Sequence, residues 1–162
     1  MMENKMYFRI TLIVIICFVC SIVAQAQINR NVLGMTVGST TKSQAVATLH
    51  KNADNNGSEI TLENIQYEGY TWDKCVLLFV NDKLAEVSMW SNTKSARSRF
   101  INLTKTLGEK YYAYGAHFAD GWTYFNYGGV RYDIRYYTHT YLFDDQIGIT
   151  ITDIQLRRQK KN

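Results

Sequence analysis

The sequence predicts an α+β domain of two layers, in which an antiparallel sheet carries its helices on one face. Two stretches have apolar residues spaced by three and four, the period of an amphipathic helix. Each is followed by three stretches rich in β-branched and aromatic residues, as in β-strands. The chain contains no proline, and glycine or asparagine pairs mark the predicted turns. An α-β-β-β layout is therefore predicted twice, in halves spanning about 38–90 and 91–156.

The first 26 residues have the pattern of a secretory signal peptide. Lys5 and Arg9 precede an apolar run over residues 10–23, and Ala24-Gln25-Ala26 places small residues at a cleavage site. An uncleaved anchor is the alternative, but a run of about fourteen residues is short for a membrane span of roughly 20. We expect cleavage near Ala26-Gln27 and a periplasmic or secreted protein.

In the first half, "STTKSQAVATLHKNADNNG" predicts a helix after a short leading segment. Thr41 and Gln44 fit a capping box, in which each side chain accepts a hydrogen bond from the other residue's amide. Val46, Leu49 and Ala53 form its apolar face, and residues 55–57 end it. Three strands follow, joined by turns at 68–69 and 81–82: Ile60–Tyr67, Tyr70–Val80 and Lys83–Trp90.

In the second half, a helix is predicted to begin after residues 91–93, and its buried face is marked by an apolar stripe: Ala96, Phe100, Leu103, Leu107 and Tyr111. Three strands follow at about Trp122–Tyr127, Val130–Thr138 and Gln146–Leu156. Residues 157–162 are predicted to be a basic C-terminal tail exposed to solvent. Residues 27–156 then make one domain, of a length that can bury a substantial core.

Strand register decides which side chains face outward. If residues 81–82 form a two-residue turn, Val80 faces Lys83, and Val76, Leu78, Ala85, Val87 and Met89 lie under the helices. The opposite face then carries Cys75, Leu77, Phe79, Leu84, Glu86, Ser88 and Trp90.

With a turn at Gly128-Gly129, the second hairpin places Thr123, Phe125, Tyr127, Val130, Tyr132 and Ile134 inward, where Ile147, Ile149 and Ile151 can join them. Its outer face pairs Trp122 with Arg135, Tyr124 with Asp133, and Asn126 with Arg131.

Residues 111–143 contain thirteen aromatic side chains, and tryptophan, tyrosine and arginine concentrate binding energy in protein interfaces. An exposed aromatic ladder that only stabilises the sheet is the alternative interpretation. The candidate binding residues lie on the expected outer face: Phe79, Trp90, Trp122, Tyr124, Arg131, Arg135 and Tyr137.

Other chemistry finds little support in the sequence. The S-x-x-K matches at Ser39 and Ser91 coincide with predicted helix caps and have no companion motif, and the histidines are scattered. We predict no catalytic residue, metal site or cofactor.

Without the signal, 16 basic and 13 acidic residues remain, and the last six residues carry four of the positive charges. The body is thus near neutral, which argues against nucleic-acid binding. Cys75 is then the only cysteine, and we expect it to be buried, with an intermolecular disulfide as the alternative.

Gly34-Met35-Thr36, Val46 and Leu49, and the turn "NDKL" at residues 81–84 resemble the small exported proteins of the BamE/SmpA-like and β-lactamase-inhibitor-protein-like group. The resemblance covers about 55 residues of the first half, and the second half by layout. The chain differs from the group in having no lipid-anchoring cysteine and no Gly-x-Pro after the first helix. The resemblance implies protein binding through the sheet or its edge, without catalysis or cofactor.

We therefore expect an exported, non-enzymatic domain that binds an envelope or secreted protein through the outer face of its sheet. Glycan or small-molecule binding is the alternative, with Trp72, Trp90 and Trp122 as stacking platforms. A hydrolase of unrecognised type is a third hypothesis, which a pocket uniting a nucleophile with a histidine would support.

Overall fold

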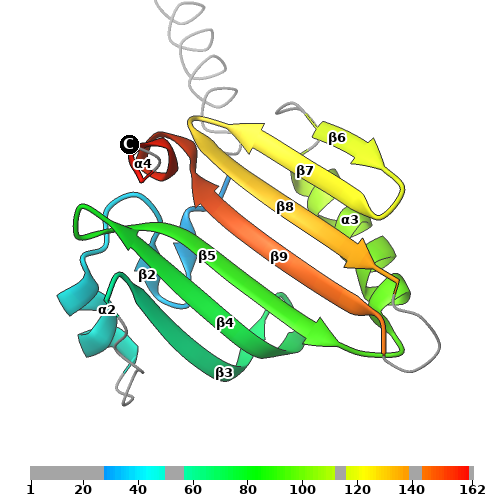
Figure 1. Ribbon diagram of the computed structural model, residues 1–162. Coiled ribbons are helices and arrows are strands. Elements are labelled where there is room, and N and C mark those ends of the chain that lie inside the picture. Colours follow the sequence, from blue (N-terminus) through cyan, green and yellow to red (C-terminus); the bar gives the residue numbers. More distant parts are fainter. Residues whose placement is uncertain (1–27, 50–56, 112–115, 139–143, 161–162) are drawn as a thin grey trace, which may run out of the picture.

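The computed structural model describes residues 28–49, 57–111, 116–138 and 144–160, so the predicted signal peptide lies outside the described residues. It confirms the α+β class and the antiparallel sheet (Figure 1). The seven-stranded sheet has the order β3-β4-β5-β9-β8-β7-β6. Its strands are β3 (Glu59–Tyr67), β4 (Tyr70–Val80), β5 (Lys83–Asn92), β6 (Ala116–Ala119), β7 (Trp122–Tyr127), β8 (Val130–Tyr137) and β9 (Gln146–Asp153). The remaining elements are β1 (Asn31–Val32), β2 (Met35–Thr36), α2 (Lys42–Leu49), α3 (Ala96–Tyr111) and α4 (Ile154–Gln159).

The two predicted halves meet where β5 pairs with β9, the last strand of the chain. Three elements were not predicted from the sequence: the β1–β2 hairpin, the short edge strand β6 and the C-terminal helix α4. None of the helices in the described ranges has the length and apolar character that crossing a membrane requires.

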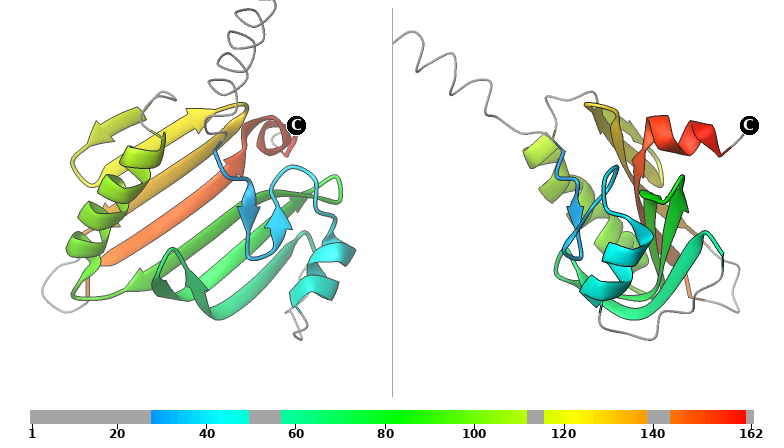
Figure 2. Two further views of the ribbon diagram at one scale, coloured as in Figure 1. Left: turned by 180° about the vertical axis from the view of Figure 1, so that it is seen from behind. Right: turned by 90° about the vertical axis from the view of Figure 1, so that its left-hand side faces the viewer.

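One face of the sheet, which we call the back face, is covered by α3 and by the β1–β2 hairpin (Figure 2). The predicted stripe of α3 is confirmed, because Ala96, Leu103, Leu107 and Tyr111 are buried and Phe100 packs against the core. Across the core, the inward residues of the second hairpin and β9 are at most 1% exposed: Thr123, Phe125, Val130, Tyr132, Ile134, Ile147, Ile149 and Ile151. Tyr127, at the end of that row, is 45% exposed.

The second hairpin has the predicted register throughout, including Trp122 opposite Arg135 and Tyr124 opposite Asp133. The first hairpin departs from its prediction after the turn. Val80 faces Lys83 as expected, but the register then shifts by one, so that Leu78 pairs with Glu86 and Leu77 with Val87. The predicted faces of β4 are therefore exchanged. The core receives Cys75, Leu77, Phe79 and Leu84 together with Val87 and Met89, while Leu78 faces the opposite side.

At α2 the predicted capping box is confirmed. Thr41 N donates to Gln44 Oε1 at 2.9 Å, and Gln44 N donates to Thr41 Oγ1 at 3.3 Å. The predicted apolar face is wrong for Val46, which is 36% exposed, because the helix turns Ala45 toward the core instead. Leu49 packs partly against the core, and Ala53 lies outside the described residues.

The C-terminal segment differs from its prediction as a strand followed by a free tail. β9 ends at Asp153, whose carboxylate accepts hydrogen bonds from the amides of Gln155 and Leu156 and so begins α4. Helix α4 packs on β4, β5 and β9 on the side of the sheet opposite α3 (Figure 2). It is held there by Arg157 bonded to Glu86.

Cys75 is fully buried and free, as expected for a small apolar side chain in the core. Burial raises the pKa of its thiol to about 12, because the thiolate would lose its hydration. The thiol is therefore protonated at neutral pH and shielded from reagents.

Candidate ligand-binding face of the sheet

The face of the sheet opposite α3, which we call the front face, is open except where α4 covers one end (Figures 1 and 2). Strand register arranges its side chains in rows that run across neighbouring strands. One row joins Trp90, Gly148, Arg135 and Trp122. The next row joins Ser88, Thr150, Asp133 and Tyr124, and a third joins Glu86, Thr152, Arg131 and Asn126.

On β7 and β8 these rows form what we call the aromatic–arginine cluster: Trp122, Tyr124, Arg131, Asp133 and Arg135. The guanidinium carbon of Arg131 lies 4.2 Å from the centroid of the Tyr124 ring, and that of Arg135 lies 4.9 Å from the Trp122 ring. Such cation–π contacts hold long side chains in place, because the ring face attracts the positive charge. The cluster is thus ordered before any ligand arrives.

Asp133 is the centre of this cluster. Its carboxylate accepts from Arg131 Nε at 2.8 Å, from Arg131 Nη2 at 2.7 Å and from Trp122 Nε1 at 2.9 Å. Its side chain is only 9% exposed, so these charge-assisted bonds are partly shielded from water. Arg135 Nη2 stays 3.8 Å from the same carboxylate, a longer and weaker contact.

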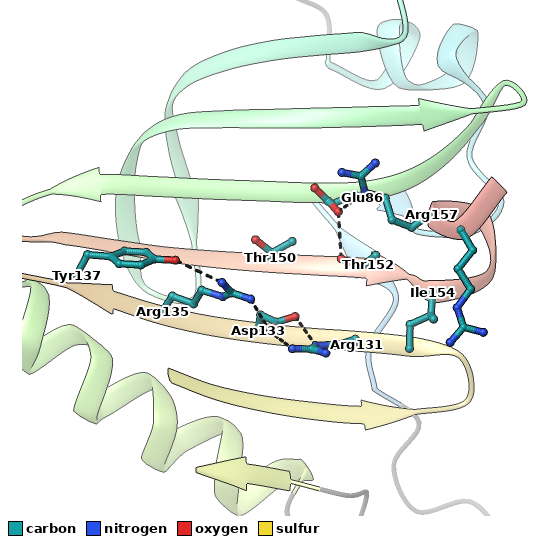
Figure 3. Close-up of a pocket in the computed structure, with 10 residues that line it drawn as sticks. Glu86, Arg131, Asp133, Arg135, Tyr137, Thr150, Thr152, Ile154 and Arg157 are labelled. Carbon is teal, nitrogen blue, oxygen red and sulfur yellow. Dashed lines mark hydrogen bonds and ion pairs between the residues drawn. The ribbon is translucent and has the colours of Figure 1, made fainter. Parts of the chain in front are cut away.

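An open pocket of about 580 Å³ lies beside the cluster, between β8, β9, β5 and α4 (Figure 3). Ten residues line it: Glu86, Arg131, Asp133, Arg135, Tyr137, Thr150, Thr152, Ile154, Arg157 and Arg158. A smaller hollow of about 180 Å³ continues toward Trp90 and Gln146, and it shares Arg135, Tyr137 and Thr150 with the larger one. We call the two together the front groove.

The floor of the front groove is β9, which presents small side chains between two taller walls. Thr150 and Thr152 occupy its centre, and Gly148 leaves a gap between Trp90 and Arg135. A Cβ atom on Gly148 would lie 3.8 Å from Trp90 Cβ and 3.3 Å from the carbonyl oxygen of Met89. The glycine therefore keeps this part of the floor low.

Helix α4 brings two further arginines to the end of the groove. Arg157 Nε donates to Glu86 Oε2 at 3.0 Å, and Thr152 Oγ1 also donates to Glu86 Oε2 at 3.4 Å (Figure 3). The position of α4 depends on Asp153, which caps the helix and accepts from Arg30 Nη1 at 3.1 Å. Two segments at opposite ends of the described chain thus fix the arginines of α4.

The structure places six of the seven predicted binding residues on the front face: Trp90, Trp122, Tyr124, Arg131, Arg135 and Tyr137. Arg135 and Tyr137 are exposed, and the other four are half-buried. The seventh is wrong, because Phe79 is 4% exposed and lies in the core after the register shift. Trp72, proposed as a stacking platform, is fully buried as well.

Sequence reasoning missed the groove floor and the arginines of α4. The capping residue Asp153 before "IQLRRQ" was the available signal for a helix there. Nothing in a single sequence indicates that β9 pairs with β5.

The described residues hold no group of three histidine, cysteine or acidic side chains arranged to bind a metal ion. The groove, as lined by described residues, contains hydroxyls, guanidinium groups and two carboxylates, and no histidine or cysteine. These groups are hydrogen-bond donors and acceptors for a ligand.

Comparisons with protein-family models, with curated protein sequences and with solved structures found no match for this chain. The resemblance to BamE/SmpA-like and β-lactamase-inhibitor-protein-like proteins stays a prediction.

Proposed function

We propose that this chain is a non-enzymatic binding domain that binds a protein through the front face of its sheet. The observation that carries the proposal is an ordered aromatic–arginine cluster next to an open pocket of about 580 Å³ on an uncovered sheet face. The N-terminal pattern supports a site of action outside the cytoplasm, after removal of residues 1–26.

The size of the front face suits a protein partner. Six spacings between seven strands give about 30 Å, and eight residues along a strand give about 25 Å, so the sheet has a footprint of at most roughly 750 Å², including the end that α4 covers. A typical interface buries about 800 Å² on each partner. Because Arg131 and Arg135 are already held against rings, binding would not have to order these two side chains.

Ring stacking against a sugar is less well supported, because neighbouring groups already pack on these rings. His117 stacks on Tyr124 with ring centroids 5.0 Å apart, and both Arg131 and Arg135 lie over Trp122. Lys74 lies 5.7 Å from the Trp90 ring centroid.

The proposal is tested with the purified protein as bait in an extract of the producing cells and in their medium. A double variant, Arg135→Ala with Tyr137→Ala, removes two exposed groups of the front face, and Arg97→Ala removes an exposed arginine from α3 on the back face. Each recovered partner is then purified, and its affinity is measured for the unchanged protein, the double variant and Arg97→Ala.

We expect the double variant to bind its partner at least about tenfold more weakly, as for loss of central interface residues, and Arg97→Ala to bind normally. A specific partner held equally well by all three forms would show that the front face is not the site. A glycan array run on the same proteins tests the alternative ligand class.

A further inference from the structure

We infer that the front groove binds an extended, acidic segment of the partner protein, with carboxylates of that segment on Arg135 and Arg158. The inference rests on the proposed function and adds the chemistry of the partner. Three features of the groove support it: its excess of positive charge, its free hydrogen-bond donors and its length.

The larger pocket of the groove carries four arginines and only two acidic residues. Each carboxylate is already paired with one arginine, Asp133 with Arg131 in a two-point contact and Glu86 with Arg157. Two guanidinium groups, those of Arg135 and Arg158, are left in excess of the acids. Charge complementarity therefore favours an anionic ligand.

The two excess arginines are also poorly satisfied as donors. Arg135 Nη1 reaches Tyr137 Oη only at 3.5 Å, and its Nη2 stays 3.8 Å from Asp133. Arg158 is exposed and has no ion pair within the part of the chain that the structure describes. A guanidinium group offers five donors in a planar fork that fits a carboxylate, so both side chains have bonds to give.

The shape of the groove favours a peptide over a small free anion. Its floor follows β9 from Thr152 to Gln146, six residue steps, or about 20 Å of extended chain. A partner segment of six or seven residues in the same conformation fits that length. Alternate side chains of such a segment lie about 7 Å apart on one side, so several carboxylates can face the arginines together.

The test uses fluorescence anisotropy with the full protein and a labelled heptapeptide in which glutamate alternates with alanine. A peptide with glutamine in place of glutamate is the uncharged control. Inorganic phosphate and a sulfated oligosaccharide are added as competitors, because both also match a basic groove. Arg97→Gln is the control variant, since it removes the same charge from the back face.

We expect the glutamate peptide to bind and the glutamine peptide not to bind. Arg135→Gln and Arg158→Gln should each weaken binding about fivefold, as for loss of one solvent-exposed charge pair, and Arg97→Gln should leave it unchanged. Glu86→Gln should have the opposite sign and tighten binding by about threefold, because it removes a competing carboxylate from the groove while the glutamine side-chain oxygen can still accept from Arg157 and keep α4 in place. A variant that merely damaged the fold would not tighten binding.

Equal binding of the two peptides, or equal weakening by Arg97→Gln, would overturn the inference. The inference would also be overturned if the sulfated oligosaccharide bound in a way that depends on Arg135 while the glutamate peptide did not bind. Displacement of the bound glutamate peptide by an equimolar amount of phosphate would overturn it as well. If the peptide fails while the natural partner still depends on Arg135 and Tyr137, the acidic segment is wrong and the proposed function stands. If the partner is also insensitive to both residues, the proposed function fails with it.

Discussion

Removing the carboxylate of Asp133 is the most direct test of the front face. In Asp133→Ala, the guanidinium of Arg131 loses both of its short bonds and the indole N–H of Trp122 loses its acceptor. Breaking a buried ion pair costs about 3–5 kcal/mol. Because the side chain of Arg131 is 30% exposed, water replaces part of the loss, and we expect about 3 kcal/mol. The unfolding entropy of roughly 130 residues converts this to about 10 °C in Tm.

Calorimetry and urea denaturation measure this loss, with Asp120→Ala as the matched control. Asp120 is an exposed aspartate in the β6–β7 turn, and its removal should change the free energy of unfolding by less than about 0.5 kcal/mol. A double-mutant cycle of Asp133→Ala with Arg131→Ala should give a coupling energy of about 1.5 kcal/mol or more. Equal melting temperatures for the two aspartate variants, or a coupling energy near zero, would refute the arrangement described for the cluster.

Three further predictions concern stability away from the groove. Between pH 9 and 10 the free energy of unfolding should fall by about 1 kcal/mol on account of Cys75, since the unfolded thiol is half ionised near pH 9 while the folded thiol stays protonated up to about 12. In urea titrations Cys75→Ala should reduce the pH dependence by that amount without abolishing it, because burial also raises the pKa of Tyr67 and Tyr132; an unchanged slope would contradict the prediction. Glu68→Asn should stabilise the β3–β4 hairpin by about 0.5 kcal/mol, because residue 68 has a φ of 48°, which asparagine adopts more readily than glutamate. An unchanged Tm would count against that reasoning. Thr41→Ala should cost about 1 kcal/mol in urea denaturation, because it breaks the capping box of α2. An unchanged free energy of unfolding would contradict this role of Thr41.

The register of the second hairpin was predictable because its turn admits one geometry. Gly128 and Gly129 both have positive φ values, 58° and 79°, as a two-residue turn requires. From that fixed corner, the alternation of apolar and polar residues identifies the inner and outer faces without ambiguity. The aromatic–arginine cluster follows directly from this local information.

The first hairpin has an equally well-predicted turn, with φ values of 49° and 59° at Asn81 and Asp82. The error comes one step later, at a bulge between Leu78 and Phe79. At this bulge two successive residues are apolar on each strand, Leu78 and Phe79 on β4 and Leu84 and Ala85 on β5. Either register therefore buries similar side chains, and the sequence does not discriminate between them. Phe79 was misplaced for this reason.

The groove itself depends on contacts between distant parts of the chain. Its floor exists because Glu86 pairs with Thr152 and Trp90 with Gly148, residues about 60 positions apart, and nothing local to either strand specifies that pairing. The basic residues after Ile154 were assigned to a tail because their charge, and not the cap at Asp153, was used to interpret them. Local patterns thus predict one wall of the site, and tertiary pairing supplies the floor and the other wall.

Strand β9 explains why such a groove can be rigid. Its odd-numbered residues Ile147, Ile149 and Ile151 are fully buried against the back layer, while Gly148, Thr150 and Thr152 alternate with them on the front face. The strand is paired on both sides, with β5 and β8, so its backbone is fixed by two ladders. A ligand on this floor therefore binds to an already ordered surface, and most of its binding free energy is available for contacts with the walls rather than for ordering the site.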